Sequence, residues 1–328
     1  MGRLTHRERV ERTLNFLPTD RPAKDLGSSR VTGMNAWTYR KLRRTLGLPE
    51  RTTRVYDLSQ FLAEMDLELL DALGCDFIML PLQILPLELR RAGWKPFRFW
   101  DDLDYEVPEH FHPRKTSDGA LECGHGYPWN NACRKMVQGC YYFERIEIRT
   151  GGIKPTSGGI SIPHQEETDW SFVKPFSDEF LRAEESAAIR LWNETDKSIV
   201  ASATHSGLGL PVGYGDAIGW VMKLLTDPSH AADYMHKEAE ALSKRSEGYI
   251  EAVGKYTSVF VLSQVDFGTQ KSELFNPEIF KNYYLPAWKY TLDKIRKKAP
   301  AVKLFIHTCG SIKNLIPFFI EAGIHILN

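Results

Sequence analysis

Three apolar runs in the C-terminal half of the chain are each followed by side chains that can act in catalysis. These side chains are His205 after the first run, Asp266 and Gln270 after the second, and His307 and Cys309 after the third. In parallel α/β folds, ligands bind at the carboxyl ends of the strands. If the three runs are neighbouring parallel strands, their polar ends form one candidate site.

The segment His307-Thr308-Cys309-Gly310 is the most informative of the three. Residues two apart in a strand point to the same face, so His307 and Cys309 can share one. Imidazole and thiolate together form a soft ligand set that suits zinc. Two ligands do not close a structural site, but they fit a catalytic site with three protein ligands and one open position. Gly310 allows the backbone to turn sharply after the pair.

Structural roles remain open for each of these residues. His-x-Cys spacing also arises by chance, and a free cysteine is commonly a small buried hydrophobe. Asp266 can equally cap a helix or a loop, and His205 can be a core histidine. The residues Cys123, His125, Cys133 and Cys140 match the spacing of no regular zinc finger or ribbon. We therefore do not expect a second zinc module there.

The elements that must position these residues alternate along the chain from residue 178 onward. The pattern predicts helices over 178–194, 216–225, 228–253, 277–298 and 312–322, and strands over 198–204, 259–264, 302–307 and 324–327. Strands separated by helices imply right-handed βαβ units and a parallel sheet.

The N-terminal half is less regular. Thr5 and Glu8 have the spacing of a capping box, so a helix is expected to begin there. The pattern then predicts a strand over 23–26, helices over 35–46 and 60–73, and a buried strand over 75–80. Aromatic residues, glycines and short β-like runs dominate from about 85 to 165, which predicts β-hairpins inserted into the main fold or capping it.

About seven strands result from this count, with one placed in the irregular region near 142–160. The closest regular architecture is a (β/α)₈ TIM barrel, which needs eight. The sequence stops at Asn328, directly after a predicted strand. We therefore expect one barrel domain over residues 1–328 that is C-terminally incomplete and lacks its final strand and helix. The alternative is an open, doubly wound sheet.

Composition limits the classes of function. Lys+Arg and Asp+Glu both total 42, so the formal net charge is zero. This balance argues against general binding of nucleic acid or of acidic membranes. The N-terminus has no signal-peptide pattern, and no apolar run is long enough to cross a bilayer. Five scattered cysteines, an odd number, indicate reduced thiols and a cytoplasmic protein.

Taken together, the segments resemble the uroporphyrinogen decarboxylase superfamily over nearly the whole chain. The resemblance rests on Arg7 to Val10, Pro18 to Pro22, Leu69 to Asp76, Val265 to Gln270, Phe305 to Gly310 and Ile320 to Asn328. It implies the (β/α)₈ fold and an enzyme.

The decarboxylase branch of that family carries an arginine-rich segment after the first strand, which grips the carboxylates of the substrate. Here the corresponding stretch, residues 27–34, offers only Arg30, and the family's catalytic aspartate is missing from Leu80-Pro81-Leu82-Gln83. A uroporphyrinogen decarboxylase or related cofactor-free decarboxylase is therefore the second interpretation. Arg30 and His205 are the candidate substrate-binding residues.

A second branch, the methylcobalamin:coenzyme M and related corrinoid methyltransferases, carries a His-x-Cys zinc motif at the end of the sixth strand. His307 and Cys309 match this motif, while the third ligand of that branch, a cysteine, would lie beyond residue 328. The resemblance implies Zn²⁺ and a corrinoid supplied by a corrinoid-binding partner protein, with a small-molecule methyl acceptor or donor. Asp266 and Gln270 would then assist catalysis. A non-catalytic barrel that binds a tetrapyrrole or corrinoid is a third interpretation.

Overall fold

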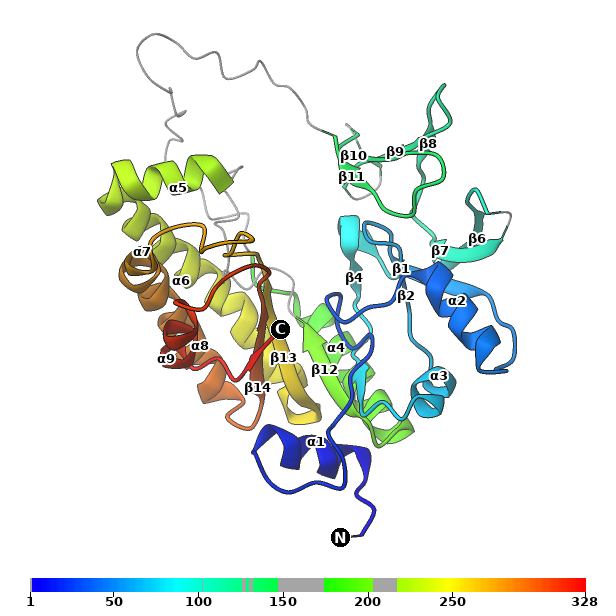
Figure 1. Cartoon of the computed structure of the whole chain (residues 1–328), viewed down its shortest axis with the longest axis horizontal. Helices are drawn as coiled ribbons and strands as arrows, with labels where there is room; N and C mark the ends of the chain where they lie inside the picture. Colours follow the sequence, from blue (N-terminus) through cyan, green and yellow to red (C-terminus); the bar gives the residue numbers. More distant parts are fainter. Residues whose placement is uncertain (1, 102, 126–127, 130–131, 147–173, 203–216) are drawn as a thin grey trace. The chain divides into compact units, whose positions relative to one another are not determined.

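The computed structural model of the chain (Figure 1) describes residues 2–101, 103–125, 128–129, 132–146, 174–202 and 217–328. It divides into two units. Met1–Pro22 and Ser161–Asn328 form one, here called the split unit because its two segments flank the other in sequence. Ala23–Ile160 forms the second, here called the inserted unit. The expected single domain over residues 1–328 stays a prediction.

The split unit contains the predicted alternation of helices and strands. Its helices are α1 (His6–Leu14), α4 (Asp178–Glu194), α5 (Ala217–Thr226), α6 (Pro228–Val253), the 3₁₀ turn η3 (Gly254–Tyr256), α7 (Pro277–Ile279), the π-helix η4 (Phe280–Tyr284), α8 (Leu285–Lys298) and α9 (Ile316–Ala322). Its strands are β12 (Ser198–Ser202), β13 (Thr257–Gln264), β14 (Lys303–His307) and β15 (Ile326–Leu327). The helix predicted over 277–298 is thus three consecutive helical segments, interrupted by a π-helical turn.

The four strands of the split unit lie in the order β15-β14-β13-β12, and every neighbouring pair is parallel. Val259 pairs with Lys303, and Phe305 pairs with Ile326. The middle of each long strand is buried, which explains why these strands appear in the sequence as continuous apolar runs. The predicted parallel α/β architecture is therefore confirmed.

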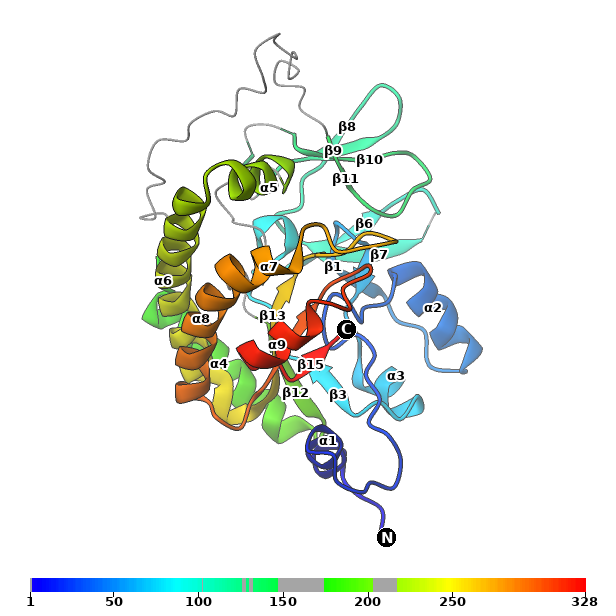
Figure 2. The ribbon, with the colours of Figure 1, turned by 60° about the vertical axis from the view of Figure 1, so that its left-hand side comes forward.

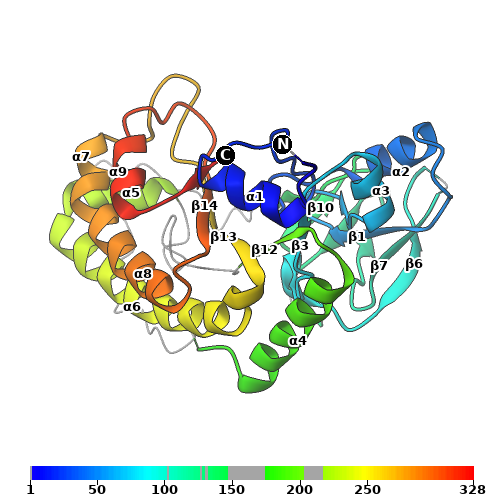
Figure 3. The ribbon, with the colours of Figure 1, turned by 90° about the horizontal axis from the view of Figure 1, so that it is seen from below.

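Helices α6, α8 and α9 lie together along one side of β13 and β14 (Figures 1 and 3). Figure 2 shows α6 and α8 side by side. A barrel wall carries its helices on the outer side only, whereas a doubly wound sheet carries them on both faces. The arrangement thus favours the barrel interpretation. The strands that the structure describes do not close into a barrel, so the closed (β/α)₈ form stays a prediction.

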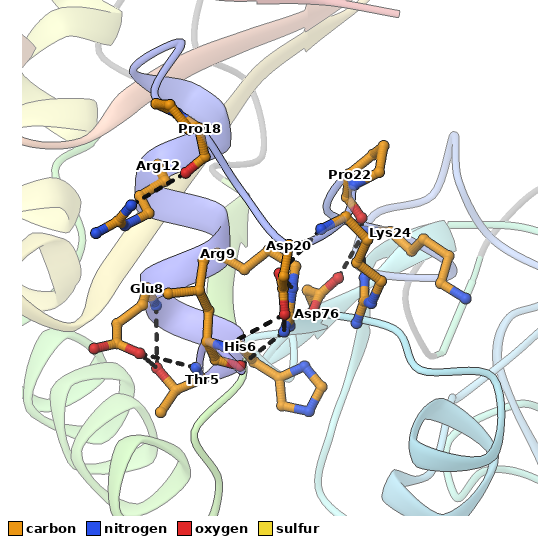
Figure 4. A network of polar contacts seen from close by, with 12 residues as sticks. Thr5, His6, Glu8, Arg9, Arg12, Pro18, Asp20, Pro22, Lys24 and Asp76 are labelled. Atoms are coloured by element: carbon orange, nitrogen blue, oxygen red, sulfur yellow. Dashed lines mark hydrogen bonds and ion pairs between the residues drawn. The ribbon is translucent and has the colours of Figure 1, made fainter. Parts of the chain in front are cut away.

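The first helix begins as its sequence predicts. The hydroxyl of Thr5 accepts a hydrogen bond from the backbone N–H of Glu8, and the Glu8 side chain accepts one from Thr5. Arg9, within the helix, donates to both carboxylate oxygens of Asp20, which follows the helix, at 2.7 and 2.8 Å (Figure 4). The Arg9 side chain is buried. Two of the segments that carried the family resemblance therefore hold the N-terminal helix and its following turn together.

The inserted unit is rich in short strands. Its elements are α2 (Ala36–Thr45), β1 (Thr53–Asp57), β2 (Leu62–Ala63), α3 (Leu67–Ala72), β3 (Phe77–Met79), β4 (Ile84–Leu85), η1 (Pro86–Glu88), β5 (Leu89–Arg90), β6 (Trp94–Arg98), β7 (Asp104–Pro108), β8 (Arg114–Lys115), β9 (Leu121–Cys123), β10 (Arg134–Met136) and β11 (Glu144–Arg145). Apart from β3, its strands form one sheet of order β2-β1-β7-β6, an antiparallel sheet of order β11-β10-β9-β8, and the hairpin β4-β5. The predicted β-hairpin character is confirmed up to residue 146, and the rest of 85–165 lies outside the described residues.

The core of the inserted unit is aromatic. The ring of Phe61 meets those of Phe99 and Tyr105 edge to face, with centroids 4.9 and 5.3 Å apart. All three side chains are buried. Edge-to-face contacts of this kind stabilise a core beyond the area they bury.

Two predictions in this unit are wrong. Residues 23–26 form no strand, although the backbone of Lys24 is bonded to Asp76 (Figure 4). The N–H of Asp76 donates to the Lys24 carbonyl at 2.8 Å, and the Asp76 carboxylate accepts from the Lys24 N–H. The helix expected over 60–73 is only α3, preceded by β2. The reason is local: Phe61 has a φ of 56°, and Asp66 caps α3 by accepting from the N–H of Leu69. The apolar spacing continues across this cap, so the sequence pattern predicted one long helix. The pattern also did not predict the strand β1.

Within the part of the chain that the structure describes, no helix has both the length and the apolar character needed to cross a membrane.

Candidate metal centre

Asp266, His307 and Cys309 meet at the carboxyl ends of two neighbouring strands. β13 ends at Gln264 and β14 ends at His307, and these two residues are partners in the parallel register. The chain that follows β13 therefore runs beside the chain that follows β14. Asp266 stands two residues after the first strand end, and Cys309 two residues after the second. The parallel register, not sequence proximity, is what unites the three.

The side-chain donor atoms converge. Nε2 of His307 lies 3.2 Å from Sγ of Cys309 and 3.7 Å from Oδ1 of Asp266. One donor atom from each residue lies within 4.8 Å of the other two. Tetrahedral zinc with normal bond lengths separates its N, S and O ligands by roughly 3.4 to 3.6 Å. The observed separations lie close to that spacing, so the three residues fit a zinc ion with only small side-chain adjustment.

Exposure differs among the three ligand candidates. The His307 side chain is 18% exposed, while that of Asp266 is 58% exposed and Cys309 is also exposed. A shielded imidazole beside two exposed donors gives a site that is anchored on one side and open on the other. Catalytic zinc sites need such an open position for water or substrate, whereas structural sites are closed by four protein ligands.

The carboxylate of Asp266 is hydrogen-bonded to the backbone of the loop that follows β14. Its Oδ1 accepts a hydrogen bond from the N–H of Cys309 at 2.8 Å. The carboxylate also acts on the thiol: desolvation raises the pKa of Cys309, and the negative charge of Asp266 raises it further. A bound cation reverses this effect, because a coordinating thiol is deprotonated by the metal. Cys309 is therefore a protonated thiol in the metal-free site, and it releases its proton when the site binds a metal ion.

The neighbouring loops approach so closely that only glycine fits at the contact. Gly310 has a φ of +91°, and a Cβ placed there would lie 2.3 Å from the carbonyl carbon of Gly268. A Cβ at Gly268 would in turn lie 2.6 Å from the N of Ser311. Gly310 thus has the turning role expected from the sequence and also permits close packing against Gly268. This backbone contact keeps Asp266 next to Cys309.

Two further residues hold the loops in place. The N–H of Phe267 donates to Oγ1 of Thr308 at 2.7 Å, and Thr308 is buried. The Phe267 ring packs edge to face on Phe280 and Tyr284, with centroids 5.7 and 5.5 Å apart. Tyr284 also accepts a hydrogen bond from Nε1 of buried Trp220 at 2.6 Å. Asp266 therefore directly precedes Phe267, whose ring is held in an aromatic core that includes two residues of the π-helix.

The other predicted site residues have different surroundings. Gln270 is exposed in the segment after β13. His205 lies outside the described residues. Arg30 belongs to the inserted unit, where its Nε donates to Asp57 at 2.6 Å and another guanidinium nitrogen donates to Ser59. No ligand cluster joins Cys123, His125, Cys133 and Cys140 in the described part of the chain.

Asn328 is the site residue that the sequence reasoning missed. Its Oδ1 lies 2.6 Å from Nδ1 of His307, within hydrogen-bond distance. Asn328 lies directly after β15, and a polar side chain at the end of a predicted strand was the sequence signal that could have identified it. The structure also supplies Asp266 as a third donor, whereas the family resemblance placed the third ligand beyond residue 328.

Comparison with protein families supports part of the expected relationship. Residues 213–328 match the family model described as Uroporphyrinogen decarboxylase (URO-D). This segment holds all three donors and Asn328, and members of that family are enzymes. The chain thus carries a URO-D family domain in its C-terminal part. No curated protein matches the chain.

Proposed function

We propose that the chain is a zinc-dependent methyltransferase of the uroporphyrinogen decarboxylase type, which moves a methyl group between a corrinoid and a thiol or similar acceptor. One observation carries the proposal: Nε2 of His307, Sγ of Cys309 and Oδ1 of Asp266 converge at the carboxyl ends of β13 and β14. The URO-D match over residues 213–328 and the His-x-Cys spacing support the same interpretation.

The three residues supply a balanced ligand set. His307 is a neutral donor, while the Cys309 thiolate and the Asp266 carboxylate contribute two negative charges, which match those of a divalent cation. The exposed side of Asp266 and Cys309 leaves room for a fourth ligand from the substrate. Zinc bound there would lower the pKa of a substrate thiol and hold it as a thiolate.

The substrate thiolate is then the nucleophile. Its sulfur would take the methyl group that a corrinoid supplies, and the electron pair of the carbon–cobalt bond would remain with the corrinoid. A corrinoid is bulky and is proposed to arrive on a corrinoid-binding partner protein, so an exposed acceptor site favours this reaction. No role is assigned to nucleic acid or membrane. The hydrogen bond from the Cys309 N–H to the Asp266 carboxylate keeps these two ligands in place while the substrates exchange.

A cofactor-free decarboxylase is the second candidate, and the family name favours it. Such an enzyme needs cationic side chains to hold substrate carboxylates. Arg30, the arginine expected for this role, is engaged with the buried carboxylate of Asp57. Its charge is therefore already paired within the inserted unit, which makes this candidate the weaker one.

Zinc content of the purified full chain tests the proposal. After loading and desalting, the wild-type protein is expected to retain about one zinc per chain, and Cys309→Ala and His307→Ala are expected to lose it. Cys140→Ala and His236→Ala, which change the same residue types elsewhere, should retain it. Full retention by Cys309→Ala contradicts the proposed site.

The reaction itself is tested with methylcobalamin and a panel of small thiols. Demethylation, followed by the change in corrinoid absorbance, should depend on zinc and disappear in Cys309→Ala. Release of carbon dioxide from a porphyrinogen by metal-free protein, unaffected by chelator, would instead favour the decarboxylase.

A further inference from the structure

We propose that Asn328 is a positioning residue that holds His307 in the tautomer with its proton on Nδ1, so that Nε2 faces the metal position with a free lone pair. This inference rests on the proposed metal centre and adds a residue to it. Its observation is the 2.6 Å contact between Nδ1 of His307 and Oδ1 of Asn328.

The backbone of Asn328 is fixed on both sides of His307. The N–H of Asn328 donates to the carbonyl of Ile306 at 3.1 Å, and the carbonyl of Asn328 accepts from the N–H of Thr308 at 3.3 Å. The preceding pair in the parallel register, Ile306 with Leu327, continues the same ladder. The Asn328 side chain therefore stands beside the imidazole because the strand register puts it there, and a change of this side chain leaves the ladder intact.

The chemistry of the contact selects one tautomer. A neutral imidazole has one N–H donor and one acceptor nitrogen, and the amide oxygen of asparagine can only accept. The proton must therefore be on Nδ1 for the short contact to be a hydrogen bond. Nε2 is then an acceptor, as its 3.2 Å contact with Sγ of Cys309 requires when the thiol donates. Metal-binding histidines commonly use such a partner on their second nitrogen.

The identity of the partner has a further consequence. An amide oxygen fixes the ring without adding charge, so the two anionic ligands alone still balance a divalent cation. An aspartate in the same place would also accept the proton of Nδ1 but would make the site more negative. Asn328→Asp is therefore expected to keep the tautomer, while Asn328→Leu, which removes the acceptor, is expected to lose it.

The tautomer is measured first, on the metal-free full chain. Long-range ¹H–¹⁵N correlation spectra of protein labelled at histidine nitrogens distinguish the two tautomers, and a His307→Gln sample identifies the His307 signals. The wild type and Asn328→Asp should show a protonated Nδ1, and Asn328→Leu should show a mixture or a protonated Nε2. A protonated Nε2 in the wild type overturns the inference.

Metal affinity is measured second, by competition between the protein and a chelator for Co²⁺ and Zn²⁺. Asn328→Leu should bind roughly 10- to 100-fold more weakly than wild type, and Asn328→Asp should stay within about threefold. At saturating Co²⁺ both variants should retain the thiolate-to-cobalt absorption band, because Cys309 remains a ligand. Asn193→Leu, an exposed site on α4, is the matched control.

The two proposals fail in different ways. If the wild type binds no Co²⁺ or Zn²⁺, the proposed function fails, while the spectra of metal-free protein still decide the role of Asn328. If the wild type binds metal and Asn328→Leu binds it equally well, the role of Asn328 is refuted and the metal centre stands.

Discussion

Asp57 in the inserted unit and Asp266 in the split unit both lie beside a basic side chain, but their carboxylates are used differently. Asp57 is fully buried and accepts hydrogen bonds from Arg30, from the backbone and hydroxyl of Ser59, and from the N–H of Gln60. Asp266 is 58% exposed and accepts one backbone hydrogen bond, from Cys309, while His307 lies 3.7 Å away.

The difference separates a structural carboxylate from one that can bind a ligand. A buried carboxylate must be fully paired, because leaving it unpaired is costly. An exposed carboxylate with spare lone pairs, held beside an imidazole and a thiol, can accept a cation at little cost. Arg30 therefore neutralises Asp57 and stabilises a turn, whereas the surroundings of Asp266 fit a metal site.

The largest expected effect on stability comes from Asp57→Ala. The substitution leaves three donors and a guanidinium without their acceptor, which should lower the free energy of unfolding by about 3 kcal/mol. Chemical denaturation of the full chain measures the change. Asp104→Ala, which breaks an exposed pair with Arg98, should cost less than about 1 kcal/mol. Equal losses in the two variants would show that Asp57 is no more structural than a surface residue.

An intermediate effect is expected for Gly310→Ala. The new Cβ would meet the backbone of Gly268 at a φ of +91°, so the loops must separate. We expect a loss of about 2 to 3 kcal/mol in unfolding free energy, together with weaker zinc binding. Gly47→Ala, at a φ of +66° with no atom within 4 Å of the added Cβ, isolates the backbone strain and should cost about 1 kcal/mol. Unchanged zinc affinity in Gly310→Ala would mean that the loop contact does not position the ligands.

The smallest effect on stability is expected for Asp266→Ala. Its carboxylate is exposed and accepts a single backbone hydrogen bond, so unfolding free energy should change by less than about 1 kcal/mol. Zinc affinity should nevertheless fall by at least about tenfold, since a donor is lost. Denaturation and chelator competition on the same sample measure both values. A variant that loses stability but keeps its zinc affinity would place Asp266 with Asp57 as a structural residue.

The regular elements of the split unit were largely predictable. The helices over 178–194 and 228–253 have the predicted bounds, because their apolar spacing and caps are local signals. The 60–73 segment was misinterpreted, since its apolar spacing also fits a helix and only the cap at Asp66 and the positive φ of Phe61 break it. The short strands of the inserted unit depend on partners distant in sequence, which no local pattern specifies.

The sequence by itself determined that His307 and Cys309 stand two apart at the end of an apolar run, and that Asp266 follows another such run. Residue type and spacing are local properties, so they are visible without a fold. Only the tertiary structure decided that Asp266 completes a three-donor cluster and that Asn328 contacts the second nitrogen of His307. Both follow from the parallel register of β13, β14 and β15 and from the close contact of Gly268 with Gly310. The strand register and the close packing bring together residues that are roughly 20 to 60 positions apart in sequence. The register is set by hydrogen bonds along whole strands, which no local pattern specifies.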